Sequence, residues 1–170
     1  MPIAVDEIPE SGRRIELAAD ADTREAIARL AGVSALPRLE AGFDLTRHGR
    51  DGLRVVGRVS ATVGQTCVVT LEPLQNEVDE AVNLLFTPQL NPKPAPAEGP
   101  RSIDADEPPE ALRDGVVDLG AVVLEFLILG IDPYPRKPAA VFAAPPAGDA
   151  GAHPFAALAA LKKGHGGKGR

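Results

Sequence analysis

The strongest hydrophobic signal in the chain lies between residues 118 and 130. Apolar residues recur there at helical spacing, at Leu119, Val122, Val123, Phe126, Leu127 and Leu129, with Glu125 as the one charge. Asp118 is placed to cap the first turn, and Pro133 and Pro135 prevent continuation of the helix. A helix that is apolar on nearly every side belongs in a core or against a partner, and this one is shorter than the ~20 residues that cross a bilayer.

A different period dominates the middle of the chain. Apolar and polar residues alternate there over Ser34–Thr46, Leu53–Gln65 and Glu77–Thr87, which predicts three strands. Asp51-Gly52 predicts the first hairpin turn, and we expect a further short strand at Thr66–Leu71 before a turn at Glu72–Asn76. The short connections between these strands predict an antiparallel meander.

The N-terminal part adds a strand and a helix. We expect the strand over Ile8–Ala18 and the helix over Thr23–Leu30, capped by Asp20 or Asp22 and ended by Gly32. The predicted buried face of this helix contains Ala26, Ile27, Leu30 and Ala31. The sequence therefore predicts an α+β fold: an antiparallel meander or partly closed sheet, covered by the buried apolar helix at about 118–130, with a short N-terminal helix.

Proline and alanine divide the chain. We expect one α+β domain over residues 1–135, interrupted at 88–112 by a flexible insertion rich in acidic residues and proline. A linker is expected over 136–153, a short amphipathic helix over 154–163 and a basic disordered tail over 164–170. Phe155, Leu158 and Leu161 form the apolar stripe of this C-terminal helix.

Composition narrows the class of protein. The 170 residues carry a formal net charge of −6 and a single cysteine, Cys67. A lone cysteine excludes an internal disulfide and leaves a cysteine-based zinc site without ligands. The first ten residues lack the basic and apolar regions of a secretory signal, so we expect a cytoplasmic protein with no membrane association.

Candidate chemistry is sparse. The three histidines fall in a turn, a linker and the tail, away from any carboxylate or thiol that would make a base or a metal site. Cys67 lies in a predicted strand, where we expect a small buried apolar role with no group nearby to lower its pKa. We therefore expect a protein that is not an enzyme, with no cofactor, metal or small-molecule substrate. For Glu125 two roles stay open: a structural one at the sheet edge or beside an arginine, and partner recognition.

Arginines give the best indication of a nucleic-acid partner. Arg54 and Arg58 share one face of a predicted strand, and Arg47 and Arg50 lie in the adjoining turn. With Lys162 and Lys163 near the end of the chain, they could contact phosphates without sequence specificity. However, Glu40, Asp44 and Asp51 lie among them and no stacking aromatics accompany them, so a solvated sheet face is an equally good interpretation.

Three segments together resemble a known family. They are the strand-rich run from Val55 to Leu74, the Val117-Asp-Leu-Gly120 entry to the apolar helix with Pro133-Tyr-Pro135 after it, and the run from His153 to Lys162. Their order and spacing resemble the bacterial YceD family of large ribosomal RNA subunit accumulation proteins, over roughly residues 10–163. Many members carry a Cys-x-x-Cys pair where this chain has Cys67 and Thr70, so a metal role inferred from such relatives does not carry over.

The resemblance implies a factor that supports the accumulation or processing of large-subunit ribosomal RNA. We expect it to bind precursor RNA or a large-subunit ribosomal protein, with Phe155, Leu158, Leu161 and Glu125 as candidate partner-binding residues. The segment containing Phe155 would either fold back onto the domain or fold on the partner. The alternative is a protein–protein interaction module without RNA contact, favoured by the acidic net charge.

Overall fold

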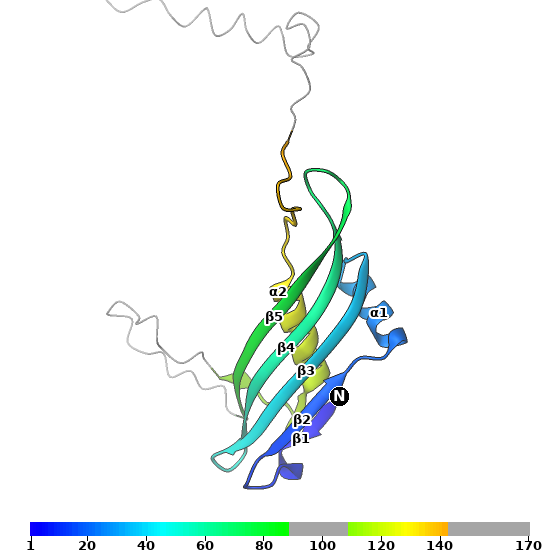
Figure 1. Ribbon diagram of the computed structural model, residues 1–170. Helices are drawn as coiled ribbons and strands as arrows, with labels where there is room; N and C mark the ends of the chain where they lie inside the picture. The colour runs from blue at the N-terminus through cyan, green and yellow to red at the C-terminus, as the bar shows by residue number, and fades with distance from the viewer. Residues whose placement is uncertain (89–108, 143–170) are drawn as a thin grey trace, which may run out of the picture.

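An open five-stranded sheet forms the body of the protein (Figure 1). The computed structural model describes residues 1–88 and 109–142. The strand order is β2-β3-β4-β5-β6, with antiparallel pairs except for the parallel β5–β6 pair. The bounds of the strands are Arg13–Ala18, Ala35–His48, Gly52–Thr66, Pro73–Thr87 and Glu110–Ala111 for β2 to β6 in turn. The predicted α+β class and the meander are confirmed, and the sheet is not closed.

The three long strands β3, β4 and β5 bury one face. The alternation predicted for β4 is confirmed, because Val55, Val59, Ala61 and Val63 are completely buried. Phe43 and Leu45 of β3 are also completely buried and Val82 of β5 nearly so, so that every second residue of the meander faces the same core.

The apolar helix α2, Leu119–Gly130, packs on this inner face against β4 and β5, as Figure 1 shows behind the sheet. Asp118 caps it as predicted: its Oδ1 accepts hydrogen bonds from the amides of Gly120 at 2.9 Å and Ala121 at 3.4 Å. The N-terminal ammonium lies 2.6 Å from the same oxygen, and its hydrogen bond lowers the pKa of Asp118. Leu119, Val122, Val123 and Leu127 are buried, whereas the far side of the helix is exposed.

Helix α1, Ala21–Ala31, packs beside β3. Its predicted ends are confirmed: the Asp20 carboxylate accepts from the Thr23 amide at 2.8 Å, and Gly32 adopts a left-handed φ of 68°. The predicted buried face was partly wrong, since Leu30 is 72% exposed and Ala28 is the residue that is buried. The side of the helix that carries Ala28 and the half-buried Ile27 faces the sheet. The contact between α1 and β3 decides which side this is.

Two strand predictions at the ends of the meander need correction. The strand predicted over Ile8–Ala18 is β2, and it begins only at Arg13, because a turn closed by the Gly12 amide and the Pro9 carbonyl occupies the start of the predicted range. The predicted strand at Thr66–Leu71 does not form. β4 runs to Thr66, the chain turns through Cys67 to Glu72, and β5 starts at Pro73, so one hairpin replaces a strand and a second turn.

Short segments at the N-terminus and just before α2 complete the core. β1, Pro2–Ala4, pairs with β7, Val116–Asp118, and the 3-10 turn η1, Val5–Glu7, follows β1. β6 falls inside the predicted 88–112 insertion, where Leu112 is buried against the core, and residues 89–108 lie outside the described part. The described part of the chain contains no helix long and apolar enough to cross a membrane.

Candidate functional site: the outer face of the sheet

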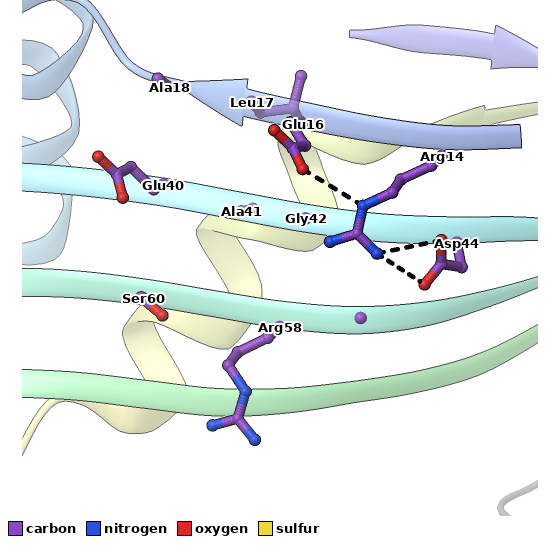
Figure 2. A pocket seen from close by; sticks show the side chains of 11 residues that line it. Arg14, Glu16, Leu17, Ala18, Glu40, Ala41, Gly42, Asp44, Arg58 and Ser60 are labelled. Carbon is purple, nitrogen blue, oxygen red and sulfur yellow. Dashed lines mark hydrogen bonds and ion pairs between the residues drawn. The ribbon is translucent and has the colours of Figure 1, made fainter.

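The outer face of the sheet carries rows of polar side chains that run across the strands. Pairing aligns Glu16, Gly42, Arg58 and Ala81 in one such row and Arg14, Asp44, Val56 and Asn83 in the next. Because Gly42 has no side chain, a shallow trough of about 690 Å³ opens over it. Figure 2 shows Arg14, Glu16, Glu40 and Asp44 around this trough, with Arg58 and Ser60 beyond.

Arg14 lies across the trough and binds carboxylates on two strands (Figure 2). Its Nη1 is 3.1 Å and 3.3 Å from the two carboxylate oxygens of Asp44, and its Nε is 3.3 Å from Glu16 Oε1. These side chains are more than half exposed, so solvent screens the pairs and each adds little to folding stability. They hold a pre-arranged set of donors and acceptors at the surface.

Two further ion pairs extend the network across β3, β4 and β5. Arg58 Nη1 lies 2.6 Å from Asp79 Oδ2, and Arg38 Nη2 lies 2.8 Å from Glu77 Oε2. The hydrogen bond from Arg58 lowers the pKa of Asp79. The pKa of Glu77 is lowered first by the hydroxyl of Thr62, which donates at 2.8 Å, and then by Arg38. Both carboxylates are therefore ionised throughout the neutral range.

Charges of both signs balance on this face. The outer positions of β2 to β5 hold four arginines and five carboxylates, namely Arg14, Arg38, Arg54, Arg58, Glu16, Glu40, Asp44, Glu77 and Asp79. Such a surface produces no extended positive field of the kind that attracts nucleic acid. It offers hydrogen-bonding groups of alternating charge.

The structure separates the four arginines that the sequence grouped. Arg54 and Arg58 do share the outer face, and Arg54 Nη2 donates to Asn83 Oδ1 at 3.1 Å. Arg47 instead holds the N-terminal segment, because its Nε and Nη2 donate to the carbonyls of Ile8 at 2.7 Å and Asp6 at 3.1 Å. Arg50 is exposed in the β3–β4 turn.

The other predicted site residues fall elsewhere. Glu125 is exposed on the far side of α2, and no ion pair or hydrogen bond joins it to the described part of the chain. Phe155, Leu158, Leu161, Lys162 and Lys163 lie outside the described residues. Sequence reasoning missed the trough residues Arg14, Glu40 and Asp44 as members of one site, although the alternation of β2 and β3 does place them on one face.

Cys67 differs from its predicted environment. Its side chain is completely buried, at the turn after β4, and its Sγ accepts from the amides of Thr70 and Lys137 at 3.4 Å each. The side chain of Thr70, followed by these amides, lowers the pKa of Cys67 to about 6, against the opposite effect of burial. The expectation that nothing would lower this pKa was wrong, because the donors come from a turn and from a segment 70 residues away.

Among residues 1–88 and 109–142, no group of three or more His, Cys, Asp or Glu side chains is placed to hold a metal ion. A second, smaller cavity of about 150 Å³ lies between α1 and the start of α2. Its lining is mainly apolar and includes Leu17, Ile27, Leu39 and Val123.

A protein-family model described as "Large ribosomal RNA subunit accumulation protein YceD" matches residues 55–162. The chain belongs to this family. The match covers most of β4 and all of β5 and α2, and it continues to residue 162, so it includes most of the sequence predicted to form the C-terminal amphipathic helix. No curated protein and no solved structure matches the chain.

The family description connects the chain with the accumulation of large-subunit ribosomal RNA. The match divides the trough: Arg58 and Ser60 lie inside the matched range, whereas Arg14, Glu40 and Asp44 lie before it. The trough therefore combines residues inside the range that the family model matches with residues that precede this range.

Proposed function

We propose that this protein supports the accumulation of large-subunit ribosomal RNA as a non-catalytic binding factor that docks a large-subunit ribosomal protein on the outer face of its sheet. The observation that carries the proposal is the trough over Gly42, which is open to solvent and lined by charges of both signs. Its floor is set by backbone pairing, and its walls are fixed by the pairs of Arg14 with Glu16 and Asp44.

The charge pattern favours a protein over bare RNA as the direct partner. Phosphates form a uniformly negative surface, and an RNA strand on this face would meet five carboxylates along with the four arginines. A protein surface supplies both signs, so each arginine and each carboxylate can exchange its present partner for one across the interface. Charge complementarity of this kind selects the partner and the docking orientation.

The lowered pKa values of two carboxyl groups on the outer face support a binding role for these two residues. General acids and bases work best with pKa values near the operating pH. Ion pairing and hydrogen bonding lower the pKa values of Glu77 and Asp79, which moves both carboxyl groups away from neutral pH. These groups serve as stable acceptors of hydrogen bonds.

One observation favours direct contact with precursor RNA as a second candidate. Arg54 pairs with a neutral amide, so its charge is not compensated by its hydrogen-bond partner, and Arg50 is exposed in the turn next to it along the sheet. Arg50 and Arg54, at the turn end of the β3–β4 hairpin, could contact phosphate while the trough takes no part in the binding.

The test is affinity capture of the tagged full chain from its own cells, with and without nuclease. Two double variants are compared: Glu40→Lys with Asp44→Lys in the trough, and Asp22→Lys with Glu25→Lys on α1 as a control of equal charge change. We expect large-subunit ribosomal proteins to remain bound after nuclease, to be lost in the trough variant and to be kept in the control. Binding that disappears with nuclease and survives the trough variant would contradict the proposal and support RNA contact.

A further inference from the structure

The far side of α2 is an apolar surface that nothing in the described part of the chain covers. Ala121, Leu124, Ile128 and Leu129 lie on it, and together with Glu125 they make up what we call the α2 outer face. Ile128 is 47% and Leu129 is 70% exposed. Neighbouring exposed apolar side chains of this size mark a surface that another segment or molecule covers.

Glu125 gives this face one charge at a defined position. It lies one helical turn before Leu129, and residues four apart are neighbours along one side of a helix. A matching segment would therefore present an apolar side chain and a basic one at the same four-residue spacing.

Residues 154–163 of the same chain have this pattern. If they are helical, Phe155, Leu158, Leu161 and Lys162 share one side, and Leu158 and Lys162 are four residues apart. An antiparallel arrangement places Leu158 beside Leu129 when Lys162 is beside Glu125. Ten helical residues span about 15 Å, which fits the roughly 18 Å of α2.

The chain is long enough to bring this segment back. Twelve residues lead from Gly130 at the end of α2 to Phe142, and twelve more lead from Phe142 to Pro154. Because an extended residue spans at most about 3.6 Å, the second stretch can retrace any path that the first one takes. The family match also extends through this sequence to residue 162.

We propose that residues 154–163 form a helix that docks antiparallel on the α2 outer face of the same molecule, with Leu158 against Leu129 and Lys162 paired with Glu125. In this arrangement α2 packs against the sheet on one side and against residues 154–163 on the other. The segment then folds back onto its own domain and does not fold on a partner. The inference does not depend on the proposed partner of the trough, which lies on the opposite face of the sheet.

The decisive experiment is a double-mutant cycle in the full chain, read as the midpoint of thermal unfolding. We expect Leu129→Ser and Leu158→Ser each to lower the midpoint by about 3–6 °C. Because both substitutions remove the same contact, the midpoint of the double variant should be no lower than that of the less stable single variant. Ala156→Ser, on the opposite side of the segment, is the matched control and should leave the midpoint within about 1 °C of the parent.

A charge exchange tests the orientation. Glu125→Lys and Lys162→Glu should each lower the midpoint by about 1–2 °C at low salt, and their combination should restore it. The effect should fade at high salt because the pair is near the surface. Failure of the combination to restore the midpoint would contradict the antiparallel pairing.

Three outcomes would overturn the proposal. Leu129→Ser and Leu158→Ser could both leave the midpoint unchanged, which would mean that the segment does not cover α2. A parent midpoint that rises with protein concentration would assign the face to a second copy of the chain. Loss of captured ribosomal proteins in these variants, without a change in stability, would assign the face to that partner and leave the trough proposal to be judged by its own test.

Discussion

The two faces of the β3–β4–β5 meander are built from alternate residues of the same strands, yet they have opposite properties. On the inner face, Phe43 is completely buried and its ring lies against Gly57. On the outer face, the guanidinium of Arg14 lies over Gly42 and the surrounding side chains are exposed. Gly42 pairs with Arg58 and Gly57 pairs with Phe43, so the two glycines are diagonal neighbours on β3 and β4 that face opposite sides of the sheet.

The comparison shows how one sheet separates stability from recognition. Inner residues are held by close packing, so adding or removing a single carbon atom changes the stability of the fold. Outer residues are held by exposed ion pairs, which contribute little to the free energy of unfolding and can therefore be exchanged for contacts with a partner. Substitutions on the inner face should change stability, and those on the outer face should change binding.

The largest effect is expected for Phe43→Ala. Removing a completely buried aromatic ring should lower the free energy of unfolding by about 3–5 kcal/mol, through lost burial and the cavity left behind. Urea denaturation followed by circular dichroism measures the change. A loss below about 1 kcal/mol would mean that the inner face is not packed as the structure shows.

The next effect compares the two glycines directly. A Cβ at Gly57 would collide with the Gly42 carbonyl oxygen and the Phe43 ring, so Gly57→Ala should lower the free energy of unfolding by about 2–3 kcal/mol. A Cβ at Gly42 would meet only Arg14 Nη2, at 3.7 Å, and Gly42→Ala should be tolerated. The same denaturation experiment compares both variants, and equal losses would contradict the distinction between the faces.

A pH-dependent effect is expected at Cys67, in the turn that follows β4. The thiol has a pKa of about 6 when folded, whereas an unfolded cysteine titrates near 8.5. Between these values the unfolded chain holds the extra proton, so the thiol contributes stability that grows from pH 6 to pH 9 and is lost as the pH falls through 6. Unfolding midpoints of the parent and Cys67→Ala at pH 6, 7.5 and 9 should therefore diverge with rising pH. Parallel profiles would contradict this role.

The smallest effect on stability is expected on the outer face. Arg58→Ala removes the pair with Asp79. Because both side chains are more than half exposed, solvent screens this pair, and the free energy of unfolding should hardly change. Any difference between the parent and the variant should shrink as the salt concentration rises, because salt screens an exposed pair. A loss as large as that of Gly57→Ala would mean that the outer network stabilises the fold.

Local signals predicted most of the elements. Period-two alternation gave β3 and β4, and Asp20, Gly32, Asp118 and Pro133 gave the ends of both helices, because caps and breakers act on residues nearby in the chain. The short β1, β6 and β7 carried no such signal. Strands of two or three residues form only where pairing and burial with distant segments stabilise them.

The site was harder to predict than the fold. The sequence placed Arg54 and Arg58 on one face, because alternation depends on position within a strand alone. It did not join Arg14 to Asp44 or remove Arg47 from the group, since both depend on which strands pair and in what register. The low pKa of Cys67 likewise depends on an amide that only the folded chain brings near.

By itself, the sequence determined the α+β class, the meander, the capped apolar helix and the family, all of which depend on local periodicity and on motifs in order along the chain. The tertiary structure decided which charges neutralise one another, which side of α2 is exposed and where the trough opens. The physical reason is that pairing register and packing join residues as far apart as Met1 and Asp118, and no pattern within a single segment specifies those contacts.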